Sequence, residues 1–71
     1  MNNKEILVEL ITQELVGFIM TDRSLEIDKA MKILYESDLF GKLQDTETGL
    51  YLEGSAYVYE ILKDEMQEKA V

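Results

Sequence analysis

Residues 4–20 of the chain read KEILVELITQELVGFIM. Large apolar side chains recur in this segment at the three- and four-residue spacing that places them on one face of an α-helix. The members of this face are Leu7, Ile11, Leu15 and Phe18, and Val8 and Ile19 widen it. Because the chain contains no proline to interrupt the run, the spacing predicts one long amphipathic helix over 4–20.

The same helix carries more apolar side chains than one face can hold. At 100° per residue, Ile6, Leu10 and Met20 lie away from the main stripe, around the small residue Gly17. Two interpretations stay open. Either the other helices surround this one, or the second face contacts a partner chain, with Gly17 allowing two backbones to approach closely. In the second case Ile6, Leu10, Gly17 and Met20 are interface residues.

The rest of the chain predicts three further helices. Together with the first, they are expected over residues 4–20, 25–36, 38–44 and 55–69. Each of the last three follows a serine, Ser24, Ser37 or Ser55, whose side-chain oxygen can accept a hydrogen bond from a first-turn amide. The segment 45–54 is expected to be an ordered loop. The sequence therefore predicts an all-α fold, a compact bundle of three longer helices plus one short helix, forming a single helical domain over 1–71.

A core for this bundle follows from the same spacing. The side chains expected in it are Leu7, Ile11, Leu15, Phe18, Ile27, Leu34, Leu43, Val58 and Leu62. The chain has 71 residues, of which 46% are hydrophobic, so the core is near the smallest that holds a fold without help. With no cysteine to form a disulfide, stability must come from packing or from a partner.

The charge of the chain limits its partners. Fifteen acidic and seven basic side chains give a net charge of −8, which repels phosphate backbones and anionic membranes alike. We therefore expect no nucleic-acid and no membrane partner. Residues 36–71 hold nine of the acids against three bases. This acidic half is either a solvated surface or a face that attracts a basic partner.

The N-terminal segment does not have the character of an export signal. Glu9 and Glu14 interrupt its apolar run, and a signal peptide needs an uninterrupted one. The run is also far shorter than the roughly 18 consecutive apolar residues expected of a membrane span. The expected location is cytoplasmic.

The sequence offers little for catalysis. There is no histidine and no cysteine, so the usual nucleophile and base pairs cannot be assembled. The four glycines do not have the spacing of a phosphate-binding loop. A calcium-loop pattern that starts at Glu36 fails, because Phe40 stands where an oxygen ligand is required. We expect no enzyme, no catalytic residue, no cofactor, no metal and no small-molecule substrate.

The four tyrosines divide between core and contact. Tyr35 and Tyr59 are expected to complete the core, while Tyr51 and Tyr57 are the better candidates for an interface. Tyrosine suits both places, because its ring can be buried while its hydroxyl stays hydrated.

Several runs resemble a group of short bacterial proteins without an assigned activity. The matching runs are AMKILYES at 30–37, FGKL at 40–43, ETGLY at 47–51 and SAYVYEIL at 55–62. The resemblance covers roughly residues 4–65 and implies a bacterial, cytoplasmic, helical protein. Some similar small families look like antitoxin-type partners encoded beside a toxin, and no catalytic residues come with the resemblance. Gly54 departs from it, since a bulkier residue is expected there.

Two functions follow as expectations. The first is a small protein-interaction module that self-associates as a homodimer or binds another chain as an antitoxin-like or regulatory partner. The alternative is a transcription-linked helix-turn-helix domain built from the helices that meet at 36–38. Against the alternative, its recognition helix over 38–44 carries only Lys42 as a base, and groove reading normally needs several.

Overall fold

The structure is a computed structural model that describes residues 3–69 of the chain. Its elements in order are α1 (Asn3–Arg23), α2 (Ile27–Tyr35), α3 (Asp38–Gln44), the 3₁₀ turns η1 (Thr46–Thr48) and η2 (Leu50–Leu52), and α4 (Ser55–Lys69). No strand occurs within the described residues, so the predicted all-α class is confirmed. The two long helices are α1 with 21 residues and α4 with 15, whereas α2 has nine and α3 seven.

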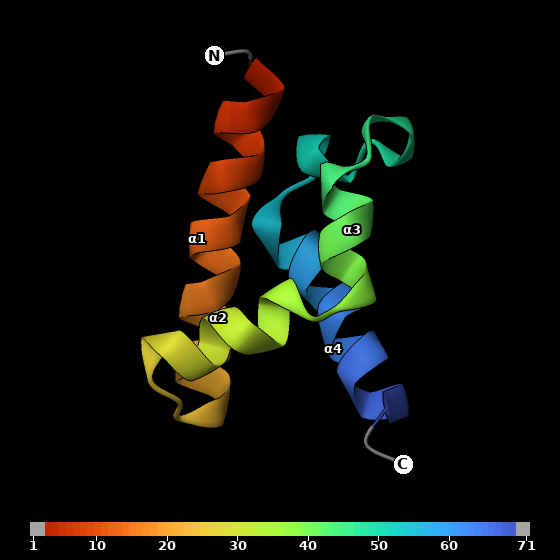
Figure 1. Cartoon of the computed structure of the whole chain (residues 1–71). Helices are drawn as coiled ribbons and strands as arrows, with labels where there is room; N and C mark the ends of the chain where they lie inside the picture. Colours follow the sequence, from red (N-terminus) through yellow and green to blue (C-terminus); the bar gives the residue numbers. More distant parts are fainter. Residues whose placement is uncertain (1–2, 70–71) are drawn as a thin grey trace.

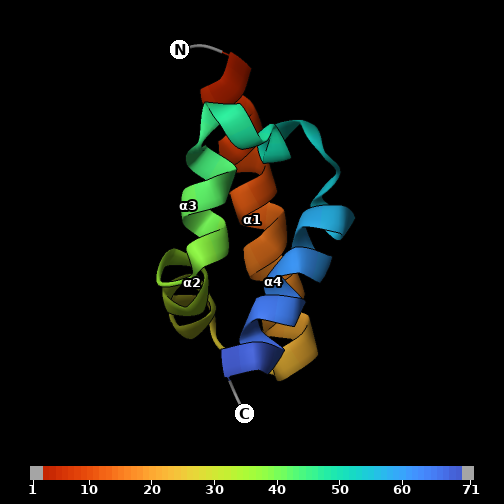
Figure 2. The ribbon, with the colours of Figure 1, turned by 90° about the vertical axis from the view of Figure 1, so that its right-hand side faces the viewer.

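The four helices enclose a common core. α1 and α3 run in opposite directions, and α2 crosses between them at one end (Figure 1). Turned by 90°, the structure shows α4 packed beside α1 (Figure 2). α1 contacts α2, α4 and η2, while α3 contacts α2, α4, η1 and η2. No helix of the described part is both long and apolar enough to cross a membrane.

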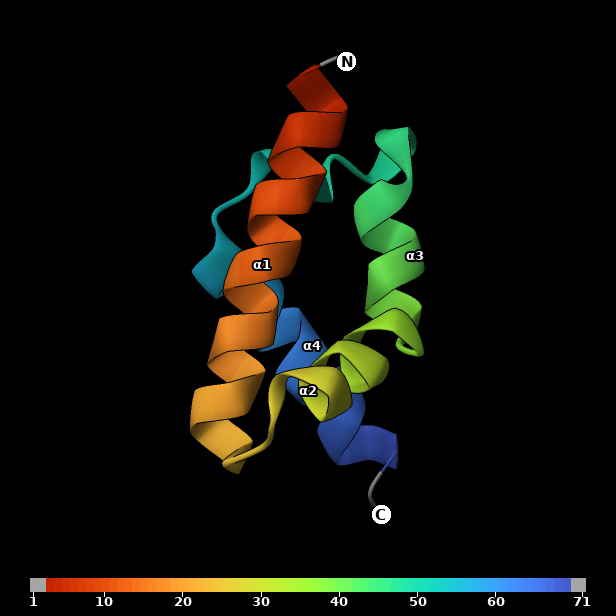
Figure 3. The ribbon, with the colours of Figure 1, turned by 60° about the vertical axis from the view of Figure 1, so that its left-hand side comes forward.

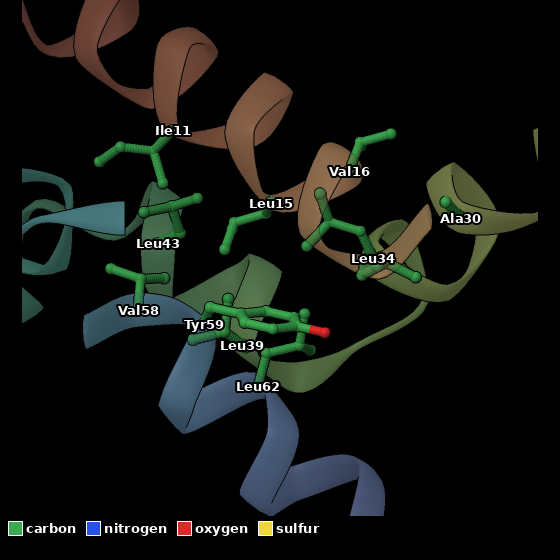
Figure 4. Packing of buried hydrophobic residues seen from close by; sticks show 11 residues of the cluster. Ile11, Leu15, Val16, Ala30, Leu34, Leu39, Leu43, Val58, Tyr59 and Leu62 are labelled. Carbon is green, nitrogen blue, oxygen red and sulfur yellow. The ribbon is translucent and has the colours of Figure 1, made fainter. Parts of the chain in front are cut away.

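One apolar core lies where the four helices meet (Figure 4). Its buried members are Ile11, Leu15, Val16, Ile19, Ala30, Leu34, Leu39, Leu43, Val58, Tyr59 and Leu62. Most of the predicted core is confirmed, and Phe18 packs against it half-buried. Leu7 is half-buried and is not part of this cluster. The prediction for Ile27 is wrong, because its side chain at the start of α2 is 57% exposed.

The connection between α1 and α2 differs from the sequence interpretation. Ser24 does not cap α2: it has a φ of +53° and lies just after the end of α1. The amide of Leu25 donates to the carbonyl of Met20 at 3.2 Å, the long hydrogen bond that closes a helix C-terminus around a left-handed residue. α1 therefore extends three residues past its predicted end. Glu26 precedes α2 without a side-chain capping bond.

The start of α3 is capped twice. The Ser37 hydroxyl accepts from the amide of Phe40 at 3.2 Å, as predicted. The carboxylate of Glu65, from α4, accepts from the amides of Asp38 and Leu39, both at 2.8 Å. Since these first-turn amides have no partner inside the helix, the two caps fix α3 in position and tie it to α4.

The segment 45–54 is ordered, as expected. The Asp45 carboxylate accepts from the amide of Glu47 at 3.0 Å and starts η1. Gly49 joins η1 to η2 with a φ of +66°, a conformation that favours glycine. The predicted capping role of Ser55 is wrong. Ser55 is the first residue of α4, and its hydroxyl donates to the carboxylate of Glu14 at 2.7 Å.

Candidate protein-interaction surface

The side of α1 that points away from the core is apolar. Ile6 and Leu10 are 42% and 51% exposed, while Leu15 and Ile19 on the opposite side of the helix are completely buried. Gly17 lies on the exposed side as well. We call Ile6, Leu10 and Gly17 the outer face of α1. Three of the four residues predicted from the first helix are thus together on one accessible surface.

Nothing in residues 3–69 explains the glycine in this face. A Cβ added at Gly17 would meet no atom within 4 Å. Glycine inside a helix is less favourable than alanine by about 0.8–1 kcal/mol, because it loses more conformational freedom on folding. The isolated fold would therefore be more stable with alanine at this position.

The other predicted interface residues lie elsewhere. Met20 and Tyr51 are half-buried and pack against the core, so each offers only part of its side chain to a partner. Tyr57, on α4, is 56% exposed. Tyr59 is buried as expected, whereas Tyr35 is 48% exposed and does not complete the core.

A groove that the sequence interpretation missed lies between α1, α2 and α3. Figure 3 shows how these three helices are arranged. The groove has a volume of about 510 Å³ and is lined by Glu9, Thr12, Gln13, Val16, Ile27, Met31, Tyr35 and Phe40. The rings of Tyr35 and Phe40 are 5.0 Å apart and join α2 to α3 at its edge. The signal for it is present in the sequence, because Ile27, Met31 and Tyr35 follow one another at four-residue spacing.

The polar contacts around Tyr59 join α4 to the end of α1. The Tyr59 hydroxyl donates to the carboxylate of Asp22 at 2.8 Å. Burial, followed by this hydrogen bond to a carboxylate, raises the pKa of Tyr59 to about 12. The ammonium of Lys63 lies 5.4 Å from the centre of the same ring. Among the side chains that the structure describes, in residues 3–67, no three acidic groups gather closely enough to hold a metal ion.

Comparison of the chain with known protein families, with curated proteins and with solved structures finds no match.

Proposed function

We propose that this protein is a small cytoplasmic interaction module that self-associates through the outer face of α1 and acts by binding and not by catalysis. The observation that carries the proposal is the exposure of Ile6 and Leu10, on the side of α1 opposite its buried stripe. Exposed apolar clusters of this kind are typical of protein contacts.

Gly17 supports the same surface. The fold of one chain does not need a glycine there, since the space around it is open. Close approach of two helices does need a small residue, because side chains otherwise keep helix axes 8–10 Å apart. A two-fold axis near Gly17 would bring the same patch of two chains together and cover Ile6 and Leu10 in both.

The resemblance to small bacterial proteins and the excess of acidic side chains support a regulatory or antitoxin-like role for the module. An acidic binding protein is suited to a basic partner, since complementary charge speeds association and excludes other acidic surfaces.

The helix-turn-helix alternative gains no support from the geometry of α3. Leu39 and Leu43 of this helix are buried, and Phe40 lines the groove. Among its remaining residues only Lys42 is basic. A helix that reads DNA needs several basic or amide side chains on its accessible side.

The direct test is Leu10→Glu. At a two-fold contact this substitution buries a carboxylate in an apolar patch and sets like charges against each other, so the dimer should dissociate. Sedimentation velocity over a range of concentrations measures this. Leu52→Glu is the matched control, because Leu52 is 68% exposed and lies on η2, outside the outer face. A wild-type chain that stays monomeric at all concentrations, or a dimer that tolerates Leu10→Glu, would contradict the proposal.

A further inference from the structure

The groove between α1, α2 and α3 exposes apolar side chains that no described part of the chain covers. Ile27 and Tyr35, both in its lining, are 57% and 48% exposed. α1 and α3 lie on its two sides, with α2 crossing between their lower ends (Figure 3). Apolar side chains this exposed are unfavourable in water unless a partner covers them.

The groove continues along α1 into a second hollow. The second hollow is lined by Lys4, Glu5, Val8, Glu9 and Gln44. Glu9 lines both, so the two hollows adjoin. Between Val16 and Lys4, at the two ends, α1 rises by about 18 Å at 1.5 Å per residue. The combined trough is as long as about three turns of an α-helix.

The depth of the trough favours a helix over a small molecule. Pockets for small molecules typically enclose 70–90% of the ligand surface. Here the side chains of Ile27 and Tyr35 are about half-exposed, so the groove is open to solvent on one side and does not enclose an occupant completely. An amphipathic helix needs no enclosure, because it inserts only the side chains of one face, at positions i, i+3, i+4 and i+7.

The charge of the trough indicates which helix fits. Glu9 is the single charged side chain among the eight that line the groove. In the second hollow the positive charge of Lys4, whose ammonium donates to the Thr46 hydroxyl at 2.9 Å, offsets the carboxylate of Glu5, so Glu9 leaves the whole trough with a net negative charge. The chain as a whole carries −8. In a two-fold contact through the groove, a second copy would set its own Glu9 against this one, whereas a basic helix complements the carboxylate.

We propose that this groove binds an amphipathic α-helix, rich in lysine or arginine, that belongs to a partner protein. The apolar face of that helix covers Ile27, Met31, Tyr35 and Phe40, and its basic flank pairs with Glu9. The proposal rests on the proposed function as a binding module, but it uses residues separate from the outer face of α1.

The test uses a helical peptide of about 18 residues with leucines at i, i+3, i+4 and i+7 and lysines on its other sides. One tryptophan on the leucine face serves as the reporter, since the protein contains no tryptophan. Titration with the full chain should shift the tryptophan emission to the blue and saturate with a dissociation constant of about 10 µM or lower. A peptide of the same composition in scrambled order, which has no apolar face, should bind at least about tenfold more weakly.

Variants of the protein locate the binding site. Ile27→Ser combined with Tyr35→Ser should weaken binding at least about tenfold. Leu52→Ser is the matched control, because it also removes an exposed apolar side chain, and it should change the affinity less than about twofold. For the charge, Glu9→Lys should weaken binding more than Glu53→Lys, which alters the net charge equally at an exposed position outside the trough.

Four outcomes would overturn the proposal. The first three are absence of peptide binding, equal binding of the scrambled peptide, and unchanged peptide affinity in the protein with both serine substitutions. The fourth is that the wild-type chain is a dimer whereas the protein with both serine substitutions is a monomer. The last outcome would show that a second copy fills the groove. A dimer that depends on Leu10, together with a peptide that does not bind, would reject the groove and leave the proposed function standing. If the peptide binds but the chain is monomeric at all concentrations, the groove proposal stands and the proposed self-association is rejected.

Discussion

Replacing Gly17 by alanine should have opposite effects on the single chain and on the dimer. In the single chain the added methyl group meets no atom within 4 Å, so it causes no clash. Alanine is favoured over glycine inside a helix by about 0.8–1 kcal/mol. The free energy of unfolding of the monomer should rise by that amount, which for a domain of this size raises the melting temperature by about 4–8 °C.

In the proposed dimer the same methyl group would lie where two α1 helices approach each other. If it prevents the closest approach, the dissociation constant should rise at least about tenfold, equivalent to about 1.4 kcal/mol. The two effects are measured separately. Urea titration in a Leu10→Glu background gives the stability of the monomer, and sedimentation equilibrium in the wild-type background gives the affinity of the dimer.

Gly41→Ala is the matched control for Gly17→Ala. Gly41 is also an exposed glycine inside a helix, and a Cβ there would likewise meet no atom within 4 Å. It should stabilise the monomer without weakening the dimer, because it lies on α3, outside the outer face. A dimer unchanged or tightened by Gly17→Ala would refute the close approach of two helices at this residue. A monomer that is not stabilised would refute the open environment assigned to Gly17.

Three other substitutions test the fold. Ser24→Gly should raise the free energy of unfolding by about 1 kcal/mol in a urea titration, since Ser24 has a φ of +53° that glycine adopts without strain. Glu65→Ala should lower the free energy of unfolding by about 1 kcal/mol, because it removes the acceptor for two amides of α3, and Glu65→Gln should have an intermediate effect. Equal stability of the wild type and both Glu65 variants would contradict this cap. Tyr59→Phe should cost about 1 kcal/mol at neutral pH, because the hydrogen bond to Asp22 is lost. The raised pKa of Tyr59 stabilises the fold below pH 10, and this contribution is lost as the pH rises towards 12. The difference in free energy of unfolding between wild type and Tyr59→Phe should therefore narrow over that range in alkaline urea titrations. A constant difference would contradict the raised pKa.

Local signals were sufficient for part of the structure. The bounds of α3 and the start of α4 agree with the prediction, because a polar residue or glycine stands at each of these positions and an apolar period follows it. The end of α1 was placed three residues early, at Met20. The polar run that follows can end a helix or continue it, and only the left-handed backbone of Ser24 ends it.

Of the two candidate surfaces, one could be predicted from the sequence and the other could not. Ile6 and Leu10 could be predicted from the helical period alone, since a residue that is out of phase with a buried stripe points away from it. The groove could not be predicted. Ile27 belongs to the apolar stripe of α2, yet its exposure depends on how α2 crosses α1 and α3.

The sequence by itself determined that the chain is helical, that Leu15 and Leu62 belong to its core, and that one side of the first helix is left apolar, because these properties depend on spacing over a few residues. The tertiary structure decided which distant groups meet. Glu65 caps a helix that starts 27 residues earlier, and Ser55 bonds a carboxylate 41 residues away. Such pairings are set by the angles at which helices cross, and side-chain packing along the whole interface fixes those angles.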